Sequence, residues 1–522
     1  MIHENLHEAL QGRYLILTAG LLFFSLVGKC LYELYINPLC KIAGPKLAAV
    51  TRLVYMYHNL MGDEHTWMRN LHLVYGDTVR ISPDQVSYSS AEAWRDIYGH
   101  ASATKKSTEK DKRFFGTTLN GTPDVIRAPA ADHSRFRRNF SHAFSDKALR
   151  EQQPLIAHYA DMLIDKLREI VQADPKARIE MVMMYNLTTF DIMGDLTFGD
   201  PLNLLKGTGN VAWVTSIFSS VKINSLRRIA RYYPWCSYFL NSLLPRSLKQ
   251  RQASHYQSCK DRVDWRVDQS LDRPDIWGLV MAQKESLRLS REEMYANSQL
   301  FMVAGTETTA TALSGLTYQL LLNPDKLEKI TNEVRDAFEQ SSDIDMLRLA
   351  QLKYLNMCID EGLRMYPPVP TGMPRLTPKE GMEICGEYIP GDVSDVYSAY
   401  HLFFLQVVPE TDVCLQTAVS VHHWATYRNP RNFTRPDEFL PERWGNDPQF
   451  ASDNKAACQP FSFGPRNCLG KNLAYHEMRL ILAKVLYHYD LRLAPESVGW
   501  EKQNTWTLWQ KNRLMVQLTP RA

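Results

Sequence analysis

A cysteine near the C-terminal end of the chain lies among residues that could bring it against a large ligand. In the segment 461–470 (FSFGPRNCLG), Cys468 is flanked by Gly464 and Gly470 and follows Arg466. Glycines allow a backbone to approach a large flat group and to turn its N–H groups toward an anion. The thiol in this loop is therefore a candidate for nucleophilic, redox or metal chemistry.

The residues around the loop help to separate these three kinds of chemistry. Positions 471–487 have helical spacing, so Cys468 should stand just before a helix N-terminus, which lowers the pKa of a thiol. A nucleophile would need a nearby base, which the sequence does not identify, and a redox pair would need a second cysteine closer than Cys458. A haem iron needs one axial thiolate, a flat cradle and cations for the propionates, and Arg466 is one such cation.

The pattern F-x-x-G-x-R-x-C-x-G resembles the haem-binding signature of the cytochrome P450 monooxygenases. This resemblance implies haem b, iron protoporphyrin IX, with the Cys468 thiolate as the axial ligand of the metal. It also implies that Phe461, Gly464, Arg466 and Gly470 belong to the loop that holds the haem.

A second motif, EGLR, places Glu361 and Arg364 three positions apart on one helix face. An ordinary surface ion pair of this kind contributes little to stability. The motif resembles the E-x-x-R pair of the same family, which is buried and is completed by an arginine from a P-E-R-W segment. That arginine is Arg443 here, and the resemblance implies that the three residues brace the cysteine loop.

A third motif, AGTETT at 304–309, lies inside a long helical pattern. Glycine in a helix interior costs about 1 kcal/mol of stability relative to alanine, so the presence of Gly305 calls for a packing or functional explanation. The motif resembles the oxygen-activation segment of the family, which implies that Ala304 and Gly305 approach the haem. It further implies that Thr308 steers water and protons and that Glu307 relays protons from solvent; an ordinary solvated glutamate is the alternative for Glu307.

A fourth segment, 131–145 (ADHSRFRRNFSHAFS), resembles the family's helix with a W-x-x-x-R motif, whose arginine binds a haem propionate. His133 replaces the tryptophan and Arg137 keeps its place, one helical step of four residues away. Both are candidates for the propionates, and Arg375 in GMPRLTP is a further one.

These motifs have to be positioned by a mainly helical chain. The pattern predicts helices at 185–198 and 291–322, the second ending at Asn323-Pro324, and short strands at 78–81, 383–389 and 514–518. A helix over 291–322 would be about 48 Å long and would cross the whole domain. Internal repeats and βαβ alternation are absent from the sequence, so we expect a mainly α fold with small β-sheets. The resemblance of the motifs implies that this is the cytochrome P450 fold.

The N-terminal region predicts a membrane anchor. The uncharged run 14–28 is short for a bilayer span, but Lys29 can snorkel and residues up to 36 can extend the helix. A signal peptide and a buried core helix are the alternatives. Basic residues follow the run more often than they precede it, which favours a single-pass anchor at 1–36, a Pro/Gly hinge at 37–50 and a cytosolic catalytic domain at 51–522. The family resemblance implies that the membrane is that of the endoplasmic reticulum.

Composition bears on the partners of the protein. The net charge of +3 is too small to suggest nucleic acid, and nine irregularly spaced cysteines fit reduced thiols better than disulfides. Phrases such as VSVHHWATYRNP resemble the fungal microsomal enzymes of mycotoxin and other secondary-metabolite pathways. That resemblance implies an apolar terpenoid or polyketide substrate, an NADPH-dependent cytochrome P450 reductase as electron donor, and cytochrome b5 as an optional second partner.

One segment departs from the family pattern. Removing 393–416 restores the continuous phrase IPGDTAVSVHHWATY, and Val393-Ser394 and Gln416 permit codons that match the two ends of an intron. We interpret 393–416 as a retained intron, with a genuine loop insertion as the alternative.

The sequence therefore predicts a membrane-anchored haem-thiolate monooxygenase that uses dioxygen. A haem-thiolate isomerase or dehydratase that needs no reductase is one alternative, and a non-catalytic, misspliced product is another.

Overall fold

The computed structural model describes residues 2–102, 106–209, 221–233, 245–269, 273–283, 288–391 and 416–521. The fold is mainly helical with small sheets, as predicted. The shorter and peripheral helices are α2 (Lys46–Val50), α3 (Leu53–Met61), α4 (Glu64–Tyr75), α5 (Glu92–Tyr98), α6 (Lys112–Phe115), α11 (Val221–Tyr232), α13 (Arg246–Asp268), α14 (Ile276–Met281), α17 (Met346–Leu349) and α20 (His423–Tyr427).

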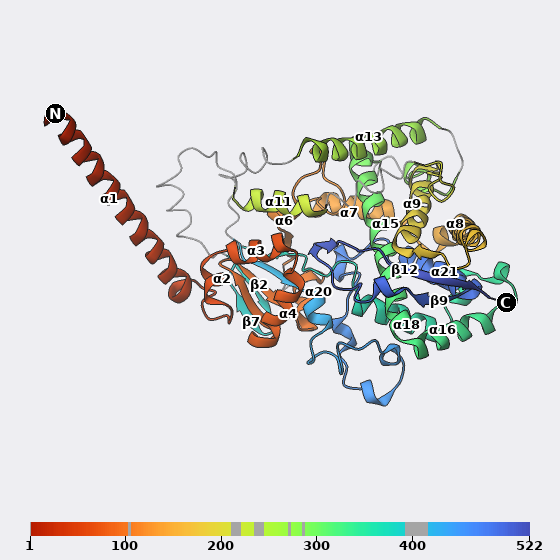
Figure 1. Cartoon of the computed structure of the whole chain (residues 1–522). Helices are drawn as coiled ribbons and strands as arrows, with labels where there is room; N and C mark the ends of the chain where they lie inside the picture. Colours follow the sequence, from red (N-terminus) through yellow and green to blue (C-terminus); the bar gives the residue numbers. More distant parts are fainter. Residues whose placement is uncertain are drawn as a thin grey trace.

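The N-terminal helix projects away from the rest of the molecule (Figure 1). It comprises α1 (Ile2–Leu31) and a π-helical turn, η1 (Tyr32–Ile36). Within the described residues, one helix is long and apolar enough to cross a membrane, Gly12–Ile36, with a mean hydropathy of 1.9. None of its apolar stretch is buried against the protein, which is compatible with the predicted anchor.

Glu33 ties the end of this helix to the body of the fold. Its Oε2 atom accepts hydrogen bonds from Arg80 Nη2 and from Asn37 Nδ2, both at 2.7 Å. Arg80 lies on β1 (Thr78–Ser82), and its side chain and that of Glu33 are each 1% exposed. The segment that follows is docked as well, because Leu39 is fully buried and Ala43 O accepts from Arg80 N at 2.8 Å.

One long helix runs through the centre of the fold (Figure 1). α15 (Arg291–Leu322) has the bounds that the sequence predicted. A capping box starts it: Ser290 Oγ accepts from Glu293 N at 3.2 Å, and the Glu293 carboxylate accepts from Ser290 N at 2.9 Å. The second half of the helix is buried on nearly every side, so α15 serves as the axis of the core.

The other main helices pack around this axis. α9 (Met181–Phe198) lies alongside it and contains the predicted helix at 185–198. The remaining large helices are α7 (Ala130–Ser141), α8 (Asp146–Ala173), α16 (Pro324–Ala337), α18 (Lys353–Met365) and α21 (Lys471–His488). Single 3-10 turns stand at η3 (Ser341–Asp343), η4 (Pro441–Trp444), η5 (Pro448–Phe450), η6 (Lys455–Ala457), η7 (Gly464–Arg466) and η8 (Pro495–Ser497).

The sheets join segments that are far apart in the sequence. A five-stranded sheet has the order β1-β2-β8-β5-β3, in which β2 and β8 are parallel. A three-stranded sheet has the order β4-β12-β9, and β10-β11 and β6-β7 are hairpins. The remaining strands are β2 (Gln85–Tyr88), β3 (Glu109–Lys110), β4 (Arg178–Glu180), β5 (Arg375–Leu376), β8 (Ala418–Val421), β9 (Tyr489–Leu493), β10 (Thr505–Trp506), β11 (Leu508–Trp509) and β12 (Met515–Pro520).

The strand predictions hold at 78–81 and near 514–518, but the prediction of one strand at 383–389 is wrong. That segment forms two antiparallel strands, β6 (Met382–Ile384) and β7 (Glu387–Ile389). Cys385 and Gly386 turn the chain between them with positive φ angles of 52° and 77°. Such angles at two central residues make the tight hairpin turn that the alternating pattern alone does not reveal.

Of the suspected insertion, residues 393–415 lie outside the described part of the chain, whereas its flanks are defined. Thr417 N donates to Gly391 O at 3.3 Å, and Thr417 Oγ1 donates to Pro390 O at 2.7 Å. The two ends of the segment therefore meet immediately before β8 begins.

Candidate active site

The cysteine loop approaches the body of the protein very closely. Cys468 lies between η7 and α21, and its N–H donates to Phe461 O at 2.8 Å. Gly464 has a φ of +73°, and a β-carbon on it would lie 2.0 Å from the carbonyl oxygen of Tyr98. Only glycine fits this approach. The loop is thus held against α5, with the Cys468 side chain exposed.

The expected depression of the thiol pKa is not found. Although the thiol is accessible at its surface, the many protein atoms around it raise its pKa, and this desolvation outweighs the lowering effects of the Gly470 N–H, of Arg137 and of Lys471. Cys468 does stand at a helix N-terminus, because Gly470 is the N-cap of α21. The helix end and the two cations are too weak to offset desolvation, so a bound metal ion would be the agent that removes the proton.

Two arginines join the loop to α7 and to the turn before it. Arg137 Nη1 donates to Asn467 O at 2.5 Å, and its Nη2 donates to Asn467 Oδ1. Arg466 donates from both terminal nitrogens to Ala128 O at 3.0 Å. The loop therefore brings Arg137 and Arg466 beside Cys468, where the sequence expected them.

Further cations gather at the same place. Arg375 on β5 pairs in register with Lys110 on β3, directly across an antiparallel ladder. Arg466 lies near both, because it lowers the pKa of Lys110 and that of Arg375, after burial as the main cause in each case. Like charges directly opposite each other destabilise a sheet unless an anion neutralises them.

His133 lies in the same cluster but is neutral. Burial, and then the charges of Arg466, Lys110, Arg137 and Arg375, lower its pKa to about 3. At neutral pH it can donate one ring N–H to an anion but adds no charge to the cluster.

Lys110 is the member of this cluster that the sequence did not indicate. It stands in the run TEKDKR, where charges at successive positions are typical of a solvated surface. Its pairing with Arg375 depends on strands that are far apart in the chain, so no local pattern could have identified it.

Glu361 and the two arginines that bind it, Arg364 and Arg443, are fully buried. Arg364 donates to both oxygens of Glu361, from Nε at 2.9 Å and from Nη2 at 2.7 Å. Arg443 Nε donates to Glu361 Oε1 at 3.1 Å and Trp444 Nε1 donates to Oε2 at 2.9 Å. Burial opposes ionisation of Glu361, yet the two guanidiniums hold its pKa below the usual value. The structure thus brings together the three residues of the two predicted motifs.

The motif on α15 places its residues on different sides of the helix. Thr308 Oγ1 donates to Ala304 O at 2.6 Å, so its lone pairs remain available to accept a hydrogen bond. A β-carbon on Gly305 would lie 2.7 Å from Met193 Sδ, so glycine lets α15 pack closely against the Met193 side chain on α9. Glu307 is 2% exposed and contacts Lys511, so its interpretation as a solvated surface residue is wrong.

Comparison with known proteins defines the family. The sequence model of the family "Cytochrome P450" matches residues 48–402 and 406–518. Cytochrome P450 monooxygenase efuB of Hormonema carpetanum is 46% identical over 504 residues, 96% of this chain and 95% of that protein. FUM2 of Gibberella moniliformis is 40% identical, covering 94% of this chain and 99% of that protein, and astJ of Aspergillus oryzae is 40% identical, covering 94% of each.

The chain therefore belongs to the cytochrome P450 family, and it is an oxygen-incorporating oxidoreductase similar to monooxygenases of fungal secondary metabolism. Membership in this family implies a haem iron with a cysteine thiolate ligand. The residues present fit that group: one exposed thiol in a glycine-lined loop stands beside a cluster of cations that needs two carboxylates.

Proposed function

We propose that this protein is a haem-thiolate monooxygenase in which Cys468 binds the iron and the surrounding cations bind the propionates. The substrate is an apolar secondary metabolite, a terpenoid or a polyketide. The overall reaction is RH + O2 + NADPH + H⁺ → ROH + H2O + NADP⁺, with the electrons of NADPH delivered by a separate cytochrome P450 reductase.

The observation that carries this proposal is the position of Arg137. Its guanidinium bonds to the residue immediately before Cys468, so the thiol and a propionate-binding cation are fixed relative to each other. Arg375, Arg466, Lys110 and the neutral His133 complete the cluster. A nucleophilic or redox cysteine has no use for so many clustered cations, whereas a dicarboxylate macrocycle does.

The residues of the chain then have separate tasks. The haem, when bound, supplies oxygen activation, which a thiolate ligand favours. Thr308 accepts a hydrogen bond from water through its free lone pairs, and Glu307 moves protons. Ala304 and Gly305 have small or no side chains, so they leave room for the haem beside α15. Phe461, whose ring packs 5.2 Å from that of Tyr475, supports the loop together with Gly464 and Gly470.

The N-terminal helix supports a place on the endoplasmic reticulum membrane with the catalytic domain in the cytosol. We propose 1–36 as the anchor and 51–522 as the catalytic domain. The connecting residues 37–50 are a bend that is docked on β1. In this arrangement the reductase and cytochrome b5, both electron donors, would meet the domain from the cytosolic side.

The decisive experiment is the carbon monoxide difference spectrum of the reduced protein. We expect the red-shifted band of a thiolate-bound haem, and its loss in Cys468→Ser. Retention of that band in Cys468→Ser would overturn the assignment of the ligand. NADPH-dependent, reductase-dependent product formation separates a monooxygenase from an isomerase or dehydratase, which turns over without either.

We further propose that 393–416 is a retained intron. Without it, Asp392 alone would link Gly391 to Thr417, and the bond from Thr417 N to Gly391 O would become that of a three-residue γ-turn. The match to the family is also interrupted between residues 402 and 406, inside this segment. Transcripts that all keep the segment, together with a normal thiolate band in the full chain, would favour a genuine loop insertion over a misspliced product.

A further inference from the structure

Glu307 is held by a cation from the C-terminal end of the chain. Lys511 Nζ lies 2.5 Å from Glu307 Oε1 and 2.6 Å from Thr311 Oγ1, and Thr311 Oγ1 lies 3.4 Å from the same carboxylate oxygen. The side chains of Lys511 and Glu307 are 4% and 2% exposed. Glu307 Oε2 is buried without a hydrogen-bond partner among the described residues.

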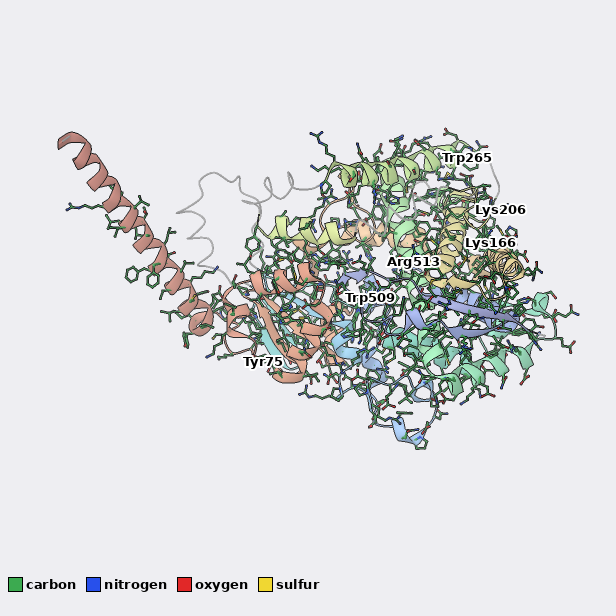
Figure 2. All side chains as sticks on the ribbon, viewed as in Figure 1. Tyr75, Lys166, Lys206, Trp265, Trp509 and Arg513 are labelled. Carbon is green, nitrogen blue, oxygen red and sulfur yellow. The ribbon has the colours of Figure 1, made fainter. Side chains whose placement is uncertain are left out.

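The backbone that carries Lys511 is fixed on both sides. Lys511 follows the β10-β11 hairpin, which is closed by a hydrogen bond from Gln510 N to Asn504 O at 2.9 Å. Trp509 (labelled in Figure 2) is buried, its Nε1 donates to Pro367 O at 2.8 Å, and its ring stacks 4.6 Å from that of Tyr366. Lys511 therefore reaches α15 from a rigid base and can hold Glu307 in one orientation.

The other ionisable groups near Glu307 do not replace this cation. Burial, and then the charges of Glu307 and Glu501, raise the pKa of Tyr366 well above its usual value, so Tyr366 is neutral and donates to Gln503 Oε1 at 2.6 Å. Burial raises the pKa of Glu307, and Lys511 is the largest opposing influence, followed by its hydrogen bond and that of Thr311. The pKa of Glu307 stays above its usual value, and Lys511 is the group that does most to oppose the effect of burial.

We propose that Lys511 is a positioning residue for proton supply: by holding Oε1 of Glu307, it keeps the carboxylate ionised and leaves Oε2 free to take up and release the proton. The inference rests on the proposed function of Glu307. The proton comes from water, binds at Oε2, and passes by way of water and the Thr308 hydroxyl into the water molecule formed from dioxygen. The electrons come from NADPH through the reductase.

The first test measures the pair without catalysis. Infrared difference spectra of the haem-loaded protein at pH 7.5, each variant minus its Glu307→Gln counterpart, isolate the Glu307 carboxyl from other protonated carboxyls such as that of Glu477. Lys511→Met should show a protonated Glu307 band in this difference, and the wild type should not. Lys511→Arg, which keeps a cation, and Arg513→Met, which removes an exposed one two positions away (Figure 2), should show no such band. The proposal is overturned if the wild type already shows the band or if Lys511→Met does not.

The second test measures coupling with a reductase and any substrate that gives product. Lys511→Met should divert electrons to hydrogen peroxide and reduce product per NADPH by about tenfold, as Glu307→Gln should. The double variant should be no worse than Glu307→Gln, because both changes remove the same function. Additive losses would show that Lys511 acts only on structure. If the wild type lacks the thiolate band in the carbon monoxide difference spectrum, the proposed function is refuted. The infrared result would still show whether Lys511 keeps Glu307 ionised.

Discussion

Glu33, at the end of the N-terminal helix, and Arg80, on strand β1, form an ion pair that is almost fully removed from solvent, with Oε2 and Nη2 2.7 Å apart. Arg80 also donates from Nη1 to the backbone oxygen of Glu33 at 2.7 Å. The pair joins the N-terminal helix to the first strand of the five-stranded sheet. It therefore restricts how the body of the fold can tilt relative to this helix.

Replacing Arg80 by Met should loosen this joint. The change leaves the Glu33 carboxylate buried without its cation, which should lower the unfolding free energy by about 3 kcal/mol. Trypsin should then cut several-fold faster after the exposed Lys41 and Lys46, as followed by gel electrophoresis. Arg95→Met removes an exposed arginine, 74% exposed, and should leave the cleavage rate unchanged.

Lys110 should contribute to haem retention. Lys110→Met removes one of the cations that we propose bind the propionates, so transfer of haem to apomyoglobin should become several-fold faster. Lys112→Met changes an exposed lysine two positions away and serves as the matched control. Equal transfer rates for both variants would remove Lys110 from the propionate site.

Glu361→Gln should destabilise the whole domain, because it leaves Arg364 and Arg443 buried without their shared carboxylate. We expect a loss of about 3–5 kcal/mol in urea denaturation, against less than about 0.5 kcal/mol for the exposed Glu328→Gln. The folded-state pKa of Glu361 is lowered, so its stabilising contribution is present above the unfolded pKa and is lost as the pH falls through the folded value. The variant should therefore lose part of the acid sensitivity of the wild type.

Glu477 on α21 should make the protein less stable as the pH rises. This carboxyl is 1% exposed, and burial raises its pKa to about 8, with a small opposite effect from Thr309. A raised folded pKa stabilises the protein below the unfolded pKa of about 4.5, and this stabilisation is lost between there and about pH 8. Glu477→Gln should be more stable than the wild type by up to about 4 kcal/mol at pH 7.5, and the difference should shrink toward pH 5. A difference that does not vary with pH would contradict the shift.

The sequence predicts well what depends on neighbouring residues. The helix at 291–322 follows from its spacing and from Asn323-Pro324 after it, and the four motifs indicate nearly the whole candidate site. The sequence did not predict the hairpin turn at Cys385-Gly386. Both residues have positive φ angles, and a pair that contains glycine can adopt them. That turn could have been found, because Gly386 interrupts the strand pattern.

Contacts between distant segments could not be predicted in the same way. Lys110 meets Arg375 because β3 pairs with β5, and Lys511 meets Glu307 because the chain returns to α15 after the last hairpin. The pKa of Cys468 was predicted in the wrong direction for a related reason. The helix end is visible in the sequence, whereas the amount of protein packed around the sulfur is not.

The place of β12 determines when the protein can complete its fold during synthesis. This strand follows both β4 and β9 in the sequence, yet it is the middle strand of its sheet and separates β4 from β9. The sheet cannot assemble until β12 has left the ribosome. The N-terminal helix emerges first, so it is available to a membrane long before the catalytic domain is closed, and the long sequence separation between β4 and β12 makes that final closure slow.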